Sequence, residues 1–283
     1  MSFFKATWTN SISRVFGKFA STQHPSFLQV GINKLYTNFT GVDLANFEPH
    51  SHYKTLNELF TRELKYARDF SKDPAKVISP CDSLISAQGN IENNTALQIK
   101  GFSYDVGELL TSHIDSELVG DLNEGTFMNF YLSPKDYHRY HVPMDMKVKK
   151  VIHVPGLLYP VNFKYLNKVP SLFVKNERVV LECYDMSERL FFIVLVGALN
   201  VGKMTLSFEP KIDSNVAGLE ARVYEYEESI ELSKGEELGM FMMGSTIAIL
   251  FEKDFVELED KIGKNIRFAD VIATKRPWLV ALV

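Results

Sequence analysis

Short apolar runs, rather than long ones, do most to limit the folds open to this chain. From Val77 onward they are divided by Gly, Pro and Asn, and two of them, 194–199 and 246–251, are almost wholly apolar. Such short runs with no polar face are typical of strands in the interior of a sheet. Strands are expected at 126–132, 147–153, 178–184, 191–199, 203–208 and 245–251.

A second pattern, with helical spacing, occupies the first 40 residues. Pro25 separates two amphipathic sets, Phe4, Trp8, Ile12, Val15, Phe16 and Phe19, and then Leu28, Ile32, Leu35 and Phe39. Another helix is expected at 56–66, with Thr55 as N-cap and Glu58 three residues later, and a short one around residues 109 and 110. These patterns predict an α+β fold, with N-terminal amphipathic helices on a mainly antiparallel, barrel-like β core.

Charge is distributed unevenly along the chain. The net charge is -4, yet residues 1–42 contain Lys5, Arg14, Lys18 and Lys34 and no acidic side chain. A basic, aromatic, amphipathic helix suits the surface of an anionic bilayer. Two helices that pack on their own domain would show the same pattern, so both interpretations stay open.

Targeting and redox signals are weak. No apolar run reaches the roughly eighteen residues of a membrane span, and the N-terminus lacks the apolar stretch of a secretory signal. Cys81 and Cys183 have no paired spacing, so neither a disulfide framework nor a cysteine zinc site is predicted. A reducing compartment fits this cysteine usage best.

Gly244, Ser245 and Thr246 open the last apolar run. They lack the Gly-x-Ser-x-Gly elbow of many serine hydrolases. They suit a serine that attacks its own preceding carbonyl, because Gly244 has no side chain to obstruct the attack and tolerates a strained backbone. The alternative is an ordinary strand that begins with small residues.

Two further motifs give this step a context. Residues 79–83 read SPCDS, and residues 131–143 read YLSPKDYHRYHVP. With the Gly-Ser step and the segments at 153–162, 169–181, 194–202 and 234–246, they resemble the phosphatidylserine decarboxylases, pyruvoyl-dependent enzymes that make phosphatidylethanolamine. The resemblance extends over roughly residues 56 to 252 in the expected order. It implies a β sandwich of lipoyl-domain-like character.

The resemblance assigns roles in self-cleavage to three residues. It implies that Ser245 attacks the Gly244 carbonyl, that His141 takes the serine proton, and that Asp82 fixes the tautomer of His141. An ester forms, and β-elimination then separates a chain of residues 1–244 from one of residues 245–283. Hydrolysis of the dehydroalanine left at residue 245 gives a pyruvoyl group and ammonia.

The resemblance also implies how turnover proceeds. The pyruvoyl ketone forms a Schiff base with phosphatidylserine, which then releases carbon dioxide, and His138 protonates the α-carbon to give phosphatidylethanolamine. Tyr131, Lys135 and Arg139 are candidates for substrate binding. The expected partners are phosphatidylserine, an anionic membrane surface and a second copy in a homodimer, with no nucleic acid. Residues 1–50 would be the membrane-associating segment and 51–283 the catalytic domain, on the cytoplasmic face of the inner membrane.

Less specific interpretations of the same residues remain. Asp82 could be a turn residue, and the two histidines could be satisfied side chains or, with a carboxylate, zinc ligands. The chain could also be an uncleaved lipid-binding module, a serine hydrolase, or a decarboxylase of another amine. One departure from the family pattern is Ser83 in place of a usual glycine. If that position required a positive φ, serine would cost about 1 kcal/mol.

Overall fold

The structure is a computed structural model that describes residues 17–99, 102–161, 163–199, 203–212, 214, 220–242 and 245–277. Gly244 and the first apolar set up to Phe16 lie outside the described residues. The helices are α2 (Ser26–Thr40), α3 (Leu56–Phe60), α4 (Val106–Leu110), α5 (Ser116–Asp121), α6 (Phe163–Leu166) and α7 (Leu172–Lys175). The strands are β1 (Lys76–Ile78), β2 (Ser83–Asn90), β3 (Thr95–Ile99), β4 (Phe102–Asp105), β5 (Thr126–Leu132), β6 (Arg139–His141), β7 (Met146–Val154), β8 (Arg178–Asp185), β9 (Leu190–Val196), β10 (Met204–Leu206), β11 (Arg222–Leu232), β12 (Glu237–Phe241), β13 (Ser245–Phe251), β14 (Val256–Leu258), β15 (Asn265–Ile266) and β16 (Val271–Lys275).

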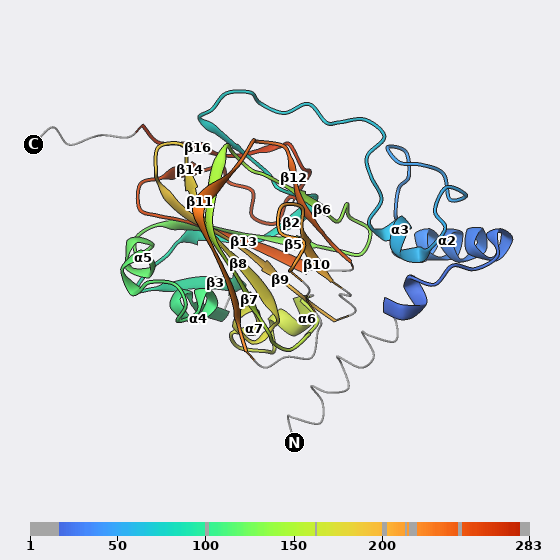
Figure 1. Ribbon diagram of the computed structural model, residues 1–283, viewed down its shortest axis with the longest axis horizontal. Coiled ribbons are helices and arrows are strands. Elements are labelled where there is room, and N and C mark those ends of the chain that lie inside the picture. Colours follow the sequence, from blue (N-terminus) through green and yellow to red (C-terminus); the bar gives the residue numbers. More distant parts are fainter. Residues whose placement is uncertain are drawn as a thin grey trace, which may run out of the picture.

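An eight-stranded antiparallel sheet forms the centre of the molecule, in the order β11-β7-β8-β9-β13-β5-β2-β15 (Figure 1). The two most apolar runs become β9 and β13, which are neighbours in this sheet and are buried along their whole length. The predicted α+β class with a mainly antiparallel core is therefore confirmed. The sheet does not close into a barrel, because β11 and β15 remain as edges.

Two three-stranded sheets, β10-β12-β6 and β1-β16-β14, and the β3-β4 hairpin complete the core. The β10-β12-β6 sheet packs on the central one, and the rings of Tyr140 and Phe241 lie 4.7 Å apart within that layer. This arrangement positions the site because β6 contains the end of the 131–143 motif and β12 leads into Ser245.

Most predicted elements form close to their expected bounds, and the differences have physical causes. The expected strands at 126–132 and 245–251 coincide with β5 and β13, and the short helix around residue 109 is α4. The strand β11 was not expected, because its sequence RVYEYEESIEL is charged and lies exposed at a sheet edge. Thr55 caps α3 as expected, with its hydroxyl accepting from the Glu58 N–H at 3.0 Å. That helix nevertheless ends at Phe60, because Arg62 turns inward.

The N-terminal helices lie at one end of the molecule, beside the β core (Figure 1). The fully buried residues of α2 are polar, namely Gln29, Asn33 and Thr37, and Ile32 and Tyr36 pack partly buried beside them. Asn33 donates to the carbonyls of His50 and Tyr53 at 2.9 and 3.0 Å, which satisfies it there. Within the described ranges, no helix is long and apolar enough to cross a membrane.

Candidate active site

Strand order brings the three sequence motifs together at one end of the central strands. Strand β5 pairs antiparallel with both β2 and β13. The start of β2, the end of β5 and the start of β13 therefore lie together. Asp82 precedes β2, the segment 133–138 follows β5, and Ser245 is the first residue of β13, opposite Leu132.

Ser245 is completely buried at this end of β13. Its Oγ has no hydrogen-bond partner within the described part of the chain. A buried hydroxyl normally has a partner, because leaving it unpaired costs about 1–3 kcal/mol. An unpaired nucleophile at the start of a central strand is therefore a functional candidate.

His138 is also completely buried, and one of its ring nitrogens is unpaired. Its Nδ1 lies 2.8 Å from the Asp136 carbonyl oxygen, and because a carbonyl can only accept, Nδ1 carries the hydrogen. Nε2 is therefore the basic nitrogen, and no described residue bonds to it. The centroid of the Phe60 ring lies 4.0 Å from that of the imidazole. The pKa of His138 is lowered to about 3. Burial is the main cause, the Asp136 carbonyl opposes the shift, and the Arg62 charge contributes to it.

Two backbone contacts bring His138 and Ser245 into the same part of the structure. Ser245 pairs with Leu132, six residues before His138. The His138 carbonyl accepts from the Phe241 N–H at 2.9 Å, four residues before Ser245. The two short segments are therefore joined near both ends, which brings the backbones of His138 and Ser245 into the same part of the structure.

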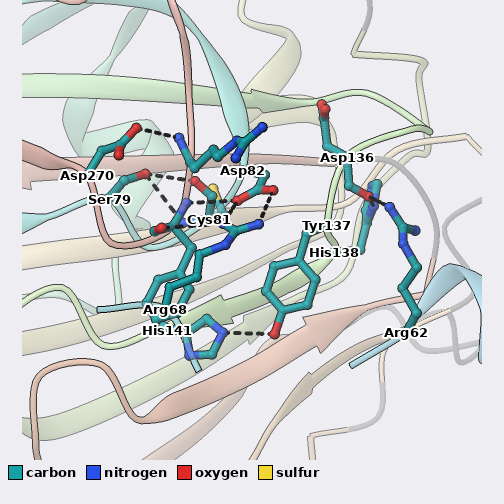
Figure 2. Close-up of polar contacts among 12 residues, drawn as sticks. Arg62, Arg68, Ser79, Cys81, Asp82, Asp136, Tyr137, His138, His141 and Asp270 are labelled. Carbon is teal, nitrogen blue, oxygen red and sulfur yellow. Dashed lines mark hydrogen bonds and ion pairs between the residues drawn. The ribbon is translucent and has the colours of Figure 1, made fainter. Parts of the chain in front are cut away.

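His141 differs from His138 in that both of its ring nitrogens are engaged. Nδ1 donates to the Gly235 carbonyl at 3.0 Å, and Nε2 accepts from the Tyr137 hydroxyl at 3.0 Å (Figure 2). The ring stacks on Phe268 with centroids 3.7 Å apart. Burial lowers the pKa of His141 to about 4, the Gly235 hydrogen bond opposes this, and the charge of Arg68 adds to it. The ring is therefore neutral at neutral pH.

Asp82 does not form the direct hydrogen bond to His141 that the sequence predicts. Arg68 binds its carboxylate with both terminal nitrogens, with 2.9 Å between Nη2 and Oδ2, and the Phe268 N–H donates to it at 2.8 Å (Figure 2). The tautomer of His141 is instead fixed by the Gly235 carbonyl. Asp82 acts on His141 at longer range, since its negative charge opposes the fall in the histidine pKa.

The three candidates for substrate binding lie in different surroundings. Tyr131 pairs with Thr246, so strand alternation places its side chain on the sheet face opposite Ser245. Lys135 is exposed and lines a cavity of about 470 Å³ together with Asp82. Arg139 is committed to the Thr61 carbonyl at 2.9 Å and to the carboxylates of Glu63 and Glu237. The structure does not bring these three together.

The structure also bears on Ser83, on the zinc alternative and on the two cysteines. Ser83 is not among the residues with positive φ, so the strain considered for a serine at this position is absent. Across the described ranges, no group of three His, Cys, Asp or Glu side chains could hold a metal ion. Cys81 and Cys183 are free and buried, and burial raises the pKa of both thiols, which keeps them protonated.

Sequence reasoning missed the residues that support the site from distant segments. Arg68 holds Asp82, Gly235 holds His141, and Arg62 contacts the loop before His138. Only Arg62 had a local signal, a charged side chain at the end of an apolar helical pattern. The other contacts depend on strand order, which no local pattern encodes.

Comparisons with known proteins agree with this geometry. The family described as Phosphatidylserine decarboxylase matches residues 56–274. A phosphatidylserine decarboxylase proenzyme from Helicobacter pylori is 43% identical over 93% of this chain and 96% of its own length. Those from Campylobacter jejuni and Haemophilus influenzae are 38% and 36% identical, over 94% and 83% of this chain and 99% and 81% of their own lengths. The chain therefore belongs to the phosphatidylserine decarboxylase family.

Proposed function

We propose that this phosphatidylserine decarboxylase is self-processed, cleaving itself between Gly244 and Ser245 to create an N-terminal pyruvoyl group at residue 245. The observation that carries the proposal is the Ser245 hydroxyl, which is buried, has no hydrogen-bond partner among the described residues and lies where the motifs of Asp82 and His138 meet. The relatives are named proenzymes, which is consistent with processing.

The surroundings of residue 245 fit such a group. Residues 245–251 pair with β5, and residues 246–251 also pair with β9, so the new terminus would be held on both sides by backbone hydrogen bonds. When present, the pyruvoyl group supplies a ketone that takes the substrate amine and accepts the electrons released with carbon dioxide. The buried side chains around it, Leu132 among them, exclude water from that position.

The topology also supports lasting association of the two chains after cleavage. The smaller chain, 245–283, would contribute β13 at the centre of the main sheet and β15 at its edge. It would also contribute β14 and β16, of which β16 pairs with β1 of the larger chain. Separation would therefore require the core to unfold, so we expect the two chains to remain together.

The two histidines would have separate tasks. In self-cleavage, the Ser245 oxygen attacks the Gly244 carbonyl carbon while His141 accepts the serine proton. The peptide C–N bond then breaks as an ester forms, and the proton passes from His141 to the freed Ser245 nitrogen. For that step His141 must exchange the Tyr137 hydroxyl for the Ser245 hydroxyl at Nε2, while Asp82 and Arg68 keep the surroundings in place. In turnover, the basic Nε2 of His138 would first take up the proton that the substrate ammonium loses and would then deliver it to the substrate carbon, a role worth about 10²- to 10⁴-fold in rate.

Helix α2 would place the enzyme on its lipid substrate. Phe27, Leu35 and Phe39, eight and four residues apart, are 82%, 72% and 90% exposed, on a helix whose fully buried residues are polar. An apolar stripe that faces solvent suits insertion into the interfacial region of a bilayer. The proposed location is a membrane surface on its cytoplasmic side, and a homodimer remains a prediction from the family resemblance.

Denaturing mass spectrometry together with a decarboxylation assay tests the proposal. The wild-type protein is expected to give two chains, the smaller of 39 residues with a blocked N-terminus, and to release carbon dioxide from phosphatidylserine vesicles. Ser245→Ala is expected to give one full-length chain and no activity. An intact wild-type chain that still releases carbon dioxide would overturn the proposal, and an intact, inactive chain that binds the vesicles would indicate a lipid-binding module.

A further inference from the structure

Three successive carbonyls in the loop before His138 are bound by side chains of the N-terminal helical part. The Pro134 carbonyl accepts from the Tyr36 hydroxyl at 3.2 Å. The carbonyls of Lys135 and Asp136 both accept from Arg62 Nη2, at 2.8 and 3.1 Å. The two Arg62 contacts are partly buried, so water competes less for these carbonyls and Arg62 orients their peptide planes.

Arg62 is itself fixed in place. It is 2% exposed, and its guanidinium lies 4.5 Å from the centroid of the Phe47 ring. Arginine has a planar group with several donors in a rigid arrangement, so one side chain can hold two neighbouring carbonyls at once. A lysine has a single flexible ammonium group and is a poorer match for this pair of acceptors.

The Asp136 carbonyl links Arg62 to the proposed proton donor. It accepts from Arg62 and also from Nδ1 of His138, at 3.1 and 2.8 Å (Figure 2). The Phe60 ring, two residues before Arg62 in the chain, lies 4.0 Å from the imidazole. The orientation of His138 therefore depends on one short segment at the end of α3.

We propose that Arg62 is a positioning residue for His138, which holds the Asp136 carbonyl so that Nδ1 keeps its hydrogen and Nε2 faces the reaction. The inference rests on the proposed function of His138 in turnover. Arg62 contacts neither Ser245 nor His141 in the described residues, so self-cleavage does not depend on it directly. Loss of Arg62 would leave the ring free to turn, and misplacement of a reacting group by about 1 Å can cost about 10²-fold in rate.

The test compares Arg62→Met with a matched control, Arg189→Met. Arg189 is also buried, lies 4.0 Å from the centroid of a phenylalanine ring and donates to the carbonyls of Arg276 and Phe255, but it lies just before β9, beside the end of β13 that is far from Ser245. We expect Arg62→Met to cleave itself like the wild type. Its kcat on phosphatidylserine vesicles is expected to fall about 10²-fold, with little change in KM. The control is expected to keep its kcat at temperatures where both variants are folded.

A spectroscopic readout separates positioning from a general loss of structure. Ring nitrogen chemical shifts of His138, identified by their loss in His138→Gln, are expected to report hydrogen on Nδ1 in the wild type and a mixture in Arg62→Met. Arg62→Lys, which keeps the charge and one donor, is expected to fall between the two in both kcat and tautomer, and it decides the matter if Arg62→Met does not fold.

Two outcomes would overturn the inference while leaving the proposed function intact. One is a wild-type enzyme that is cleaved and active beside an Arg62→Met enzyme of equal kcat. The other is a loss of kcat that Arg189→Met shares, with the His138 tautomer unchanged. A wild-type protein that is neither cleaved nor active would instead count against the proposed function.

Discussion

His138 and His141 are three residues apart, yet different parts of the molecule hold them. The His138 region is contacted by the N-terminal helical part, through Phe60 and the Arg62 contact to the Asp136 carbonyl. The His141 region is held by the second half of the chain, through Gly235 and Phe268. No described residue bonds to Nε2 of His138, whereas both ring nitrogens of His141 are engaged.

This difference shows that surroundings, and not residue type, decide what each histidine can do. A neutral imidazole with an unpaired, buried Nε2 can exchange a proton with a group that enters the site. One whose Nε2 already accepts from a tyrosine must first release that partner. The arrangement is consistent with a single maturation event at His141 and repeated turnover at His138.

The two regions also pack differently. The core around His141 is apolar inside, whereas α2 has polar residues inside and phenylalanines outside. The helical part therefore has its apolar side free for lipid while its polar side contacts the catalytic loop through Tyr36. The following predictions test whether the two regions are as separable as this comparison suggests.

The largest expected effect follows from removing His138. His138→Ala is expected to lower decarboxylation of phosphatidylserine by about 10²- to 10⁴-fold, because the substrate carbon loses its proton donor. Carbon dioxide release from vesicles measures the effect. Activity within a factor of about two of the wild type would show that the unpaired Nε2 has no part in turnover.

The next effect tests the helical part alone. Phe39→Glu is expected to weaken vesicle binding more than tenfold, since burying a phenylalanine in an apolar environment contributes about 1.5–3 kcal/mol. Asn38→Glu, which adds the same charge at an exposed neighbouring position, is the control. Vesicle sedimentation measures binding, and equal losses in both variants would mean that charge, and not the apolar stripe, governs attachment.

A smaller effect concerns stability as pH falls. The folded pKa values of His138 and His141, about 3 and about 4, lie below the ordinary 6.5, so the unfolded chain binds more protons below that pH. Stability is therefore full above about pH 6.5 and falls on acidification, by about 1 kcal/mol for each histidine between pH 7 and 5.5.

Urea unfolding of the uncleaved Ser245→Ala chain measures this dependence on a single polypeptide. Adding His138→Asn is expected to remove about half of the loss attributed to the two histidines. An unchanged pH dependence in that variant would show that His138 is not held neutral by burial.

The smallest effect tests the support of α3. Thr55→Ala removes the helix cap and is expected to cost about 1 kcal/mol of folding stability. Asp115→Ala removes the corresponding cap of α5, which lies on the opposite side of the β core from α3 (Figure 1), at a similar cost. Thermal unfolding measures both. Only Thr55→Ala is expected to slow decarboxylation as well, and equal kcat values would contradict the coupling of α3 to His138.

The sequence predicts the core well because apolar runs report burial directly. Strands β5, β9 and β13 follow from it, whereas β11 does not, since an exposed edge strand needs no apolar run. Helix α2, whose fully buried residues are polar while Leu35 and Phe39 are exposed, shows the same limit. Its spacing of Leu28, Ile32, Leu35 and Phe39 predicts a helix, but a pattern on one helix does not say which side faces the protein.

The candidate site could also be predicted from the sequence only in part. Asp82, His138, His141 and Ser245 are identified by motif, and antiparallel pairing explains why they meet. The hydrogen bonds that set their properties come from Arg68, Gly235 and Arg62, whose partners lie between 14 and 94 residues away along the chain. Those contacts follow from the tertiary arrangement alone.

The most direct test of the division between the two histidines is the intact mass of His138→Ala and His141→Ala, prepared side by side under denaturing conditions. We expect two chains from His138→Ala, as from the wild type, and a single full-length chain from His141→Ala. A whole His138→Ala chain beside a cleaved His141→Ala chain would contradict the account.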